Sequence, residues 1–352
     1  MHAVRRLVKH RQTGDDGTMT STNTQDIASR WLPAANMTPA MQHLTQAFEA
    51  PPGQSHAELD LCLTAQDGTQ LWATVFEPHT PARAVALVAP ATAVPRHYYR
   101  AFARWLCTRG YAVITLDYRG IGESRLAAQP AHSISMRDWM QQDLQAALAA
   151  VQHRARADDG APLATLWVGH SLGGHALAQC QGLEAIDAAI GVAAQLPFWR
   201  LWPRWHQRLG ALFFFGFWLP LCVRLLGGLP GWAIGGGEDL PAAAARDWSR
   251  WGLMPGYFTS DPTVEITAHR WTGTAHLWAI SDDKVFGPRR VVEALQQAFA
   301  SAPGVAELRH VTPADLGVPR IGHFGPFRRQ IGERLWPRLL DEIEMAVPQL
   351  KG

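Results

Sequence analysis

Short apolar runs that alternate with helical patterns are the feature that most constrains the fold of this 352-residue chain. The strand-like runs cover residues 84–88, 111–116, 166–168, 186–194, 276–280 and 306–311. The helical patterns cover residues 97–107, 136–151, 172–181, 289–300 and 327–345. Repeated alternation of this kind predicts an α/β fold with a mostly parallel central sheet and helices on both of its faces.

The alternation is interrupted once, over residues 196–262, where Trp, Phe, Leu and Pro are frequent and acids are few. Since open α/β sheets bind ligands at the carboxyl ends of their strands, we expect an inserted helical cap over that edge. The core is then divided into an N-terminal part, 57–195, which begins with a β-hairpin, and a C-terminal part, 263–352. Residues 1–56 are polar and interrupted by prolines, which predicts a flexible leader.

Composition narrows the class of protein. The formal net charge of +2 gives no field that would favour nucleic acid, so we expect no nucleic-acid partner. Cys62, Cys107, Cys180 and Cys222 lie far apart and form no CxxC pair, which predicts free thiols in a reducing compartment. No apolar segment follows the basic N-terminus, so a secretory signal is not expected and the predicted location is cytoplasmic.

Residues 169–174 read Gly-His-Ser-Leu-Gly-Gly and fall between a predicted strand and a predicted helix. In that context a G-x-S-x-G motif is a nucleophile elbow, where a serine on a sharp turn exposes its hydroxyl. Glycines on either side remove Cβ atoms that would clash in the strained turn. We therefore predict Ser171 as the nucleophile and the Leu172 N–H as one donor of an oxyanion hole.

A serine hydroxyl needs a base, and in this motif's fold the partners follow in the order Ser, acid, His. Asp282 and Asp283 come directly after the strand 276–280, and Asp283 is preferred as the acid because it precedes the segment that turns into the next helix. Only His310 and His323 follow. His310 lies within a strand pattern, whereas His323 lies in a loop, so His323 is the predicted general base.

The second oxyanion donor is expected from the loop after the strand 84–88. Pro90 in this loop has no N–H, so the prediction is the backbone N–H of Ala91, with Thr92 as the less favoured alternative. His170 and His175 have no third ligand at metal spacing, and no metal site is predicted.

These residues resemble the α/β-hydrolase superfamily, and most closely its serine-aminopeptidase-like (lysophospholipase-type) branch. The matching residues are Asp67-Gly68, residues 117–124 (Asp-Tyr-Arg-Gly-Ile-Gly-Glu-Ser), the elbow, Asp283 and Gly322-His323. The loop 89–94, Asp282-Asp283 and residues 248–251 (Trp-Ser-Arg-Trp) resemble a subgroup of hydrolases with little assigned substrate chemistry. The resemblance implies a Ser-His-Asp mechanism through an acyl-enzyme, without a cofactor.

The chain departs from the family pattern at two places. Ala89-Pro90 replaces the usual His-Gly, which bears on the oxyanion hole, and Ser281 replaces a glycine before the acid, which bears on the choice between Asp282 and Asp283. Asp117 and Arg119 are interpreted as structural turn residues.

The predicted cap carries seven of the fifteen tryptophans, at positions 199, 202, 205, 218, 232, 248 and 251. It also carries arginines at positions 200, 204, 208, 224, 246 and 250. This combination is typical of a packed cap, which we favour, or of an amphipathic surface that contacts a membrane. The uncharged run 209–223 would rise only ~22 Å as a helix and contains Pro220, so a membrane-spanning helix is not expected.

Together these patterns predict a serine hydrolase that cleaves an ester-type bond of a small hydrophobic acyl substrate. A peptidase, a thioesterase or an acyltransferase could use the same residues. A hypothesis of another class is a non-catalytic protein that uses the cap to hold lipid or to contact a membrane surface.

Overall fold

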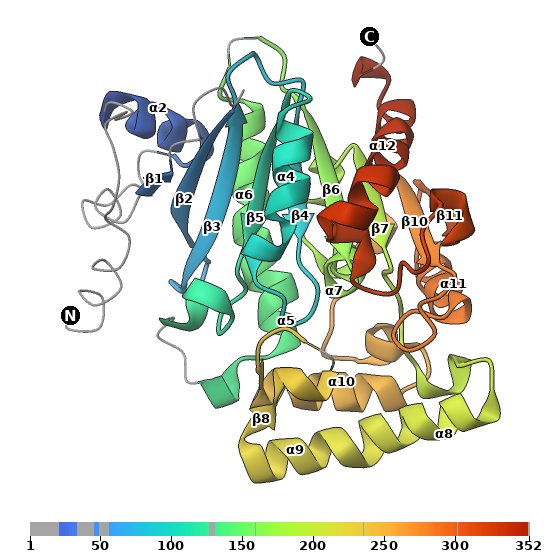
Figure 1. The fold of residues 1–352 in the computed structure, drawn as a ribbon. Coiled ribbons are helices and arrows are strands. Elements are labelled where there is room, and N and C mark those ends of the chain that lie inside the picture. The colour runs from blue at the N-terminus through green and yellow to red at the C-terminus, as the bar shows by residue number, and fades with distance from the viewer. Residues whose placement is uncertain are drawn as a thin grey trace.

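The computed structural model describes residues 21–33, 46–48, 56–126, 131–158, 160–234, 236–300 and 302–350. Nine strands in these residues form one sheet in the order β1-β2-β3-β5-β4-β6-β7-β10-β11 (Figure 1). The strands are β1 Gln46–Phe48, β2 His56–Thr64, β3 Gln70–Pro78, β4 Ala84–Ala89, β5 Tyr111–Leu116, β6 Ala164–His170, β7 Ala188–Val192, β10 Thr274–Ile280 and β11 Val305–Val311.

The sheet is antiparallel from β1 through β3 to β5 and parallel from β5 to β11. All residues of β4, β5 and β7 are buried, as expected for parallel strands covered on both faces. The predicted hairpin is present, with β2 pairing β3 from His56 opposite Pro78 to Thr64 opposite Gln70. The predicted α/β fold with a mostly parallel central sheet is confirmed.

Helices cover both faces of the sheet. Phe102 and Leu106 of α4 (Arg100–Cys107) pack in one apolar cluster with Leu335 of α12 (Arg329–Ala346). The opposite face is covered by α6 (Leu144–Ala155) and α11 (Arg289–Ala298), which belong to a second cluster. Figure 1 shows α4 and α12 in front of the sheet and α6 behind it.

The prediction of a flexible leader over residues 1–56 is wrong for one segment. Helix α2 (Ser21–Trp31) packs on the core, with the Trp31 side chain fully buried and its Nε1–H bonded to Glu77 Oε2 at 3.0 Å. Although the segment is mostly polar, four of its residues belong to the core: Ile27, Ala28, Trp31 and Leu32. Residues 1–20, 34–45 and 49–55, on which the rest of this prediction falls, lie outside the described residues.

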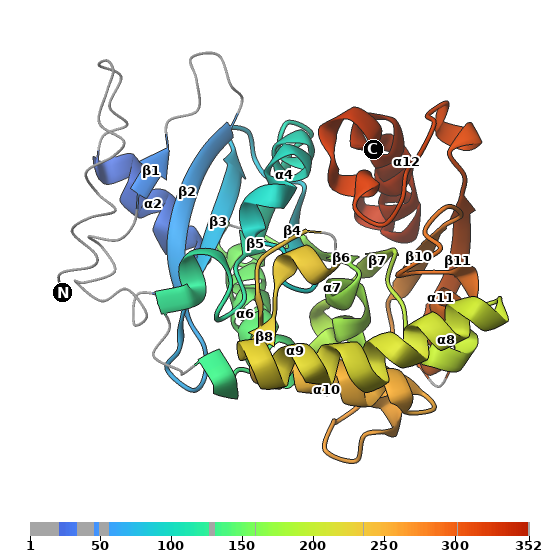
Figure 2. The ribbon, with the colours of Figure 1, turned by 60° about the horizontal axis from the view of Figure 1, so that its bottom comes forward.

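The cap is helical, as predicted, and lies across the carboxyl edge of the sheet (Figures 1 and 2). It contains α8 Trp205–Phe213, a π-helical turn Phe214–Trp218, α9 Leu219–Leu226, the short strands β8 Gly228–Leu229 and β9 Leu240–Pro241, and α10 Ala242–Leu253. The first three form one uninterrupted helix of 22 residues, Trp205–Leu226, which is long and apolar enough to cross a membrane by length and composition alone.

The helix is longer than the uncharged run 209–223 on which the length argument from the sequence rested, so that argument by itself does not exclude a membrane-spanning helix. Pro220 is the second residue of α9, where the π-helical turn gives way to α-helix, and the first turn of a helix tolerates a residue that has no N–H to donate. The helix continues through it to Leu226, and we refer to Trp205–Leu226 as the cap helix.

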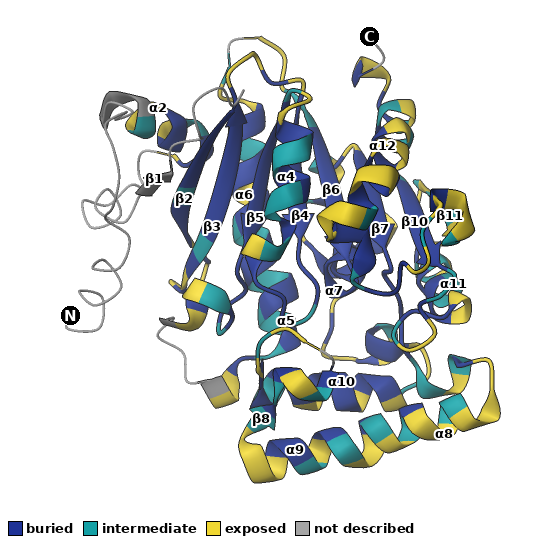
Figure 3. Cartoon of the chain, viewed as in Figure 1, coloured by how far each residue is buried: buried dark blue, intermediate teal, exposed yellow. Residues whose placement is uncertain are grey.

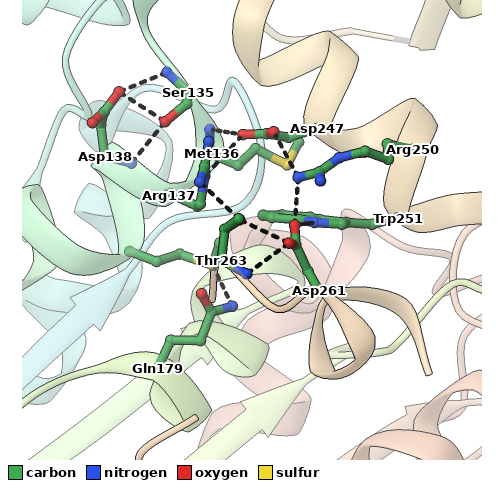
Figure 4. A network of polar contacts seen from close by, with 11 residues as sticks. Ser135, Met136, Arg137, Asp138, Gln179, Asp247, Arg250, Trp251, Asp261 and Thr263 are labelled. Atoms are coloured by element: carbon green, nitrogen blue, oxygen red, sulfur yellow. Dashed lines mark hydrogen bonds and ion pairs between the residues drawn. The ribbon is translucent and has the colours of Figure 1, made fainter. Parts of the chain in front are cut away.

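Helix α10 is fixed to the core by a polar network (Figure 4). Asp247 Oδ2 accepts from the backbone N–H of Met136, at the start of α5 (Met136–Asp138). The N-cap of this helix, Ser135, forms a capping box with Asp138. Asp261 accepts from Trp251 Nε1 at 2.7 Å and from the Arg250 guanidinium. These contacts anchor α10, the helix that lies between the cap helix Trp205–Leu226 and the core (Figure 1).

The structural interpretation of Asp117 and Arg119 is confirmed. The Asp117 carboxylate accepts from the backbone N–H of Arg96 at 2.6 Å and pairs with its guanidinium. Arg119, fully buried, bonds Asp143 at 2.7 Å and also pairs with Asp67 in the hairpin turn. These ion pairs connect the turn after β5 to neighbouring elements.

Candidate active site

Ser171 lies between β6, which ends at His170, and the short helix α7 (Leu172–His175). Its backbone has φ +52° and ψ −114°, a conformation that L-residues rarely adopt. A Cβ on Gly173 would lie well inside van der Waals contact with the carbonyl oxygen of Ala89, and a Cβ on Gly169 would overlap the backbone of Gly174. The glycines thus permit the tight turn that the motif predicts.

His323 lies in the loop between β11 and α12, and its Nδ1 is 2.6 Å from Asp283 Oδ2. Burial by itself raises the pKa of Asp283, but the nearby His323 and hydrogen bonds from His323, Gly287 and Phe286 outweigh it and leave that pKa below the usual value. An ionised carboxylate can only accept, so Nδ1 of His323 carries the proton and Nε2 presents a lone pair.

Asp282 has a different place. Its two carboxylate oxygens accept from the backbone N–H groups of Ile321 and Gly322, each at 2.9 Å. Asp282 therefore holds the loop that carries His323, while Asp283 contacts the imidazole itself. The sequence left open which of the two acids pairs with the histidine. In the structure Asp283 contacts the imidazole, and Asp282 binds the backbone of the same loop.

A chain of buried hydrogen bonds connects three loops of the site. The backbone N–H of Ala91 donates to the Tyr99 hydroxyl at 2.8 Å, and that hydroxyl lies 2.8 Å from His170 Nδ1. His170 Nε2 lies 3.0 Å from the backbone oxygen of His323. Because a carbonyl only accepts, His170 carries its proton on Nε2, so Tyr99 donates to Nδ1. Burial, with a contribution from the nearby His323, lowers the pKa of His170 to about 3, which keeps it neutral.

These hydrogen bonds correct the prediction that the backbone N–H of Ala91 is the second oxyanion donor. Its N–H is already bonded to Tyr99, in the buried interior. Ala91 and Thr92, the less favoured residue in the sequence, both line the small pocket that contains Ser171 and His323, so the bond to Tyr99 is what distinguishes their N–H groups. The other predicted donor, Leu172, is the first residue of α7, where N–H groups have no intrahelical acceptor.

Next to the Ser171 pocket lies a larger apolar cavity of about 520 Å³ under the cap. Phe214 and Phe215 of the cap helix form part of its wall. Gln195, Pro197, Ile234, Trp248 and Phe286 line both spaces. The cavity is thus adjacent to the serine and is walled mainly by carbon.

Two polar residues of the Ser171 pocket, Gln195 and His175, were not predicted from the sequence to lie there. Gln195 follows the carboxyl end of β7, and its Nε2 donates to Ser171 Oγ at 3.2 Å. His175 Nδ1 is bonded to the backbone oxygen of Gln195 at 2.8 Å, so its Nε2 is an acceptor. His175 Nε2 and Gln195 Oε1 are buried and have no hydrogen-bond partner among the described residues. Only the position of Gln195 at a strand's carboxyl end could have signalled it.

The four cysteines are buried free thiols, as predicted. Within the described part of the chain, no group of three or more His, Cys, Asp or Glu side chains is arranged to hold a metal ion.

Residues 80–229, which contain the elbow and the whole cap helix, match the family model described as "Serine aminopeptidase, S33". Among solved structures, the chain is similar to an esterase from Pyrococcus furiosus, with a TM-score of 0.53 and 14% identity over 84% of this chain and 94% of that one. It is also similar to a hypothetical protein from Pseudomonas aeruginosa, with a TM-score of 0.53 and 13% identity over 86% of this chain and 99% of that one.

A third similar structure is mouse alpha/beta hydrolase domain-containing protein 10, with a TM-score of 0.50 and 15% identity over 86% of this chain and 99% of that one. A comparison with curated proteins finds no match. At identities this low, the structural similarity establishes only that the fold is shared. The family match adds the segment that contains the elbow. The chain is therefore an α/β-fold hydrolase.

Proposed function

We propose that this hydrolase cleaves a carboxylic ester, or a related acyl bond, of a hydrophobic small molecule, with Ser171 as nucleophile, His323 as base and Asp283 as the orienting acid. The observation that carries the proposal is the 2.6 Å contact between His323 Nδ1 and Asp283, beside a pocket that His323 lines together with Ser171. The esterase from Pyrococcus furiosus, which has the same fold, is consistent with ester chemistry.

The reaction begins when the lone pair on His323 Nε2 takes the hydroxyl proton as Ser171 Oγ attacks the carbonyl carbon. Gln195 donates to Oγ, which occupies a lone pair and leaves the hydroxyl proton available for His323. Asp283 keeps the imidazole in the required tautomer and stabilises the imidazolium that forms.

The tetrahedral intermediate places a negative charge on the former carbonyl oxygen. The N–H of Leu172 and the N–H of Thr92, in the loop after β4, would donate to this oxyanion. Ala91 lines the same pocket, but its N–H is bonded to Tyr99. The imidazolium then gives its proton to the leaving alkoxide, which departs as an alcohol. Water, deprotonated by His323, attacks the acyl-enzyme, releases the acid and restores Ser171.

The adjacent cavity of about 520 Å³ favours a hydrophobic acyl or aromatic group over a charged peptide. Its wall of Phe214, Phe215 and Trp248 offers few partners for the polar groups of an extended peptide. On this basis an esterase is favoured over a peptidase that uses the same three residues.

The test combines labelling by a fluorophosphonate probe with hydrolysis of p-nitrophenyl esters of two to twelve carbons. We expect labelling of the wild type, loss of labelling in Ser171→Ala and His323→Ala, and a preference for acyl groups longer than acetyl. Folded wild-type protein that is neither labelled nor active on any ester would overturn the proposal.

A further inference from the structure

The cap helix has an outer face that is apolar and uncovered in the described structure. Trp205, Leu209, Phe213 and Phe217 are each more than half exposed, and Trp205 is 72% exposed. Their spacing of four residues places them along one side of a helix. Leu225, Leu226 and the neighbouring Trp232 extend the same exposed apolar set. We refer to these seven residues as the outer stripe.

The inner face of the cap helix already has its partner. Phe215, Leu219 and Val223 are buried, and the Phe215 carbonyl accepts from Ser249 Oγ of α10 at 2.6 Å. Phe214 packs edge-on against Trp248 at 5.5 Å between ring centroids. In Figure 3 the outward sides of α8 and α9 are exposed along their length. The outer stripe therefore does not belong to the core.

The charged residues of the segment that carries the outer stripe have one sign. Between Asp187 and Glu238 the sequence has no acidic residue, but it has arginines at positions 200, 204, 208 and 224. Arg204 lies just before one end of the cap helix and Arg224 near the other, and both are exposed. Aromatic and apolar residues flanked by arginines suit the boundary between acyl chains and anionic headgroups.

We infer that the outer stripe docks the protein on the surface of a bilayer that contains anionic lipid, with the cap helix lying in the plane of the membrane. A second copy of the chain is a poorer occupant, because pairing two such helices would bring arginines together without a carboxylate from this segment. Crossing the bilayer would strip Phe215, Leu219 and Val223 from α10, whereas lying in the interface leaves that packing intact.

Docking in this orientation bears on the substrate, a step that rests on the proposed function. The apolar cavity is lined by Gly210, Ala211, Phe214 and Phe215 of the same helix, and it adjoins the Ser171 pocket. The outer side of the helix would thus contact lipid while its inner side walls the acyl cavity. The substrate class that fits is an acyl ester of an amphiphile resident in the bilayer.

The test measures co-sedimentation of the full chain with vesicles of phosphatidylcholine alone and of phosphatidylcholine with 30% phosphatidylglycerol. The variant Phe213→Ser/Phe217→Ser changes two exposed residues that line neither the cavity nor the Ser171 pocket. The matched control is Val305→Ser/Met345→Ser, which changes two residues of similar exposure on β11 and α12.

We expect the wild type and the control to bind the anionic vesicles, and the Phe213/Phe217 variant to bind at least tenfold more weakly. Hydrolysis of soluble p-nitrophenyl butyrate should be the same in all three, while hydrolysis of an ester embedded in vesicles should fall with binding. Ser171→Ala should bind vesicles like the wild type. Wild-type protein that binds vesicles but hydrolyses no ester would contradict the proposed function and leave the docking inference in place.

Two outcomes overturn the docking inference. One is wild-type protein that does not co-sediment with either kind of vesicle. The other is a dimer, seen by sedimentation velocity, that the Phe213/Phe217 variant abolishes without any change in vesicle binding, because the outer stripe would then be a contact between copies of the chain.

Discussion

Asp283 contacts the imidazole of His323 at 2.6 Å, whereas the preceding residue, Asp282, bonds the backbone just before that histidine. Two adjacent carboxylates thus bind the same loop, one at a side chain and the other at the backbone. The first fixes the imidazole tautomer, and the second fixes the path of the chain. This division makes their substitution a sharp test of the site.

Asp283→Asn should lower kcat for p-nitrophenyl butyrate by about 10³–10⁴-fold, because an amide neither favours the Nδ1–H tautomer nor stabilises the imidazolium. Asp282→Asn should cost roughly tenfold or less, since its amide oxygen can still accept from the backbone N–H of Ile321 or Gly322. Equal losses in the two variants, with unchanged circular dichroism, would contradict the assignment of Asp283.

Gly173→Ala should destabilise the protein, because its new methyl group would overlap the Ala89 carbonyl oxygen, a backbone atom that cannot move aside. Overpacking of a rigid site costs ~1–3 kcal/mol or more, and the free energy of unfolding in urea measures it. Gly210→Ala is the control. A Cβ there meets no atom within 4 Å and lies within α8, so the change should be neutral or stabilising by up to ~1 kcal/mol.

Local motifs were enough to predict the elbow at Ser171 and the loop position of His323. Both follow from spacing along the chain, namely a strand, a glycine-flanked turn and a histidine after the last strand. The contact of Asp283 with His323 followed from the same order of elements. Each of these features lies next to the strand or helix that positions it, so it can be predicted from the sequence of that region alone.

Other features depend on contacts between distant residues. The N–H of Ala91 is directed by the hydroxyl of Tyr99 and by His170, which no pattern around residue 91 reveals. Gln195 reaches Ser171 only because β6 and β7 are neighbours in the sheet. The docking of Trp31 on Glu77 joins residues 46 apart, and it gives structure to a segment whose composition predicts none.

The corrected oxyanion assignment leads to a prediction about a covalent adduct. In a crystal structure of the fluorophosphonate-labelled enzyme, the phosphonyl oxygen should lie within about 3.1 Å of the Leu172 nitrogen and of the Thr92 nitrogen. The Ala91 nitrogen should remain bonded to Tyr99. An adduct oxygen on the Ala91 nitrogen, with the Tyr99 bond broken, would restore the original prediction.

The hydrogen bonds of Tyr99 should also matter for folding. Tyr99→Phe would leave the Ala91 N–H and His170 Nδ1 without a partner in a fully buried place. Each unsatisfied buried group costs ~1–3 kcal/mol, and urea unfolding should show a loss of that order. Tyr98→Phe is the comparison, because its hydroxyl bonds the Phe324 carbonyl at a partly exposed position, so its loss should be smaller. A larger loss for Tyr98→Phe would contradict this account of the network.

His175 should make the protein less stable in mild acid. Burial lowers its pKa from 6.5 to about 4, although the hydrogen bond to the Gln195 carbonyl opposes this shift. Between these two pKa values the unfolded chain binds a proton that the folded protein does not, so stability is complete above pH 6.5 and falls as the pH is lowered toward 4. From pH 7 to pH 5 the loss of unfolding free energy due to this residue is ~2 kcal/mol.

His175→Gln removes the titrating group and keeps every other one, so urea unfolding at the two pH values should show the wild type losing ~2 kcal/mol more than the variant. Equal losses would mean that the folded protein binds a proton at His175 as readily as the unfolded chain does, and that its Nε2 is open to water and not a buried acceptor facing the substrate pocket.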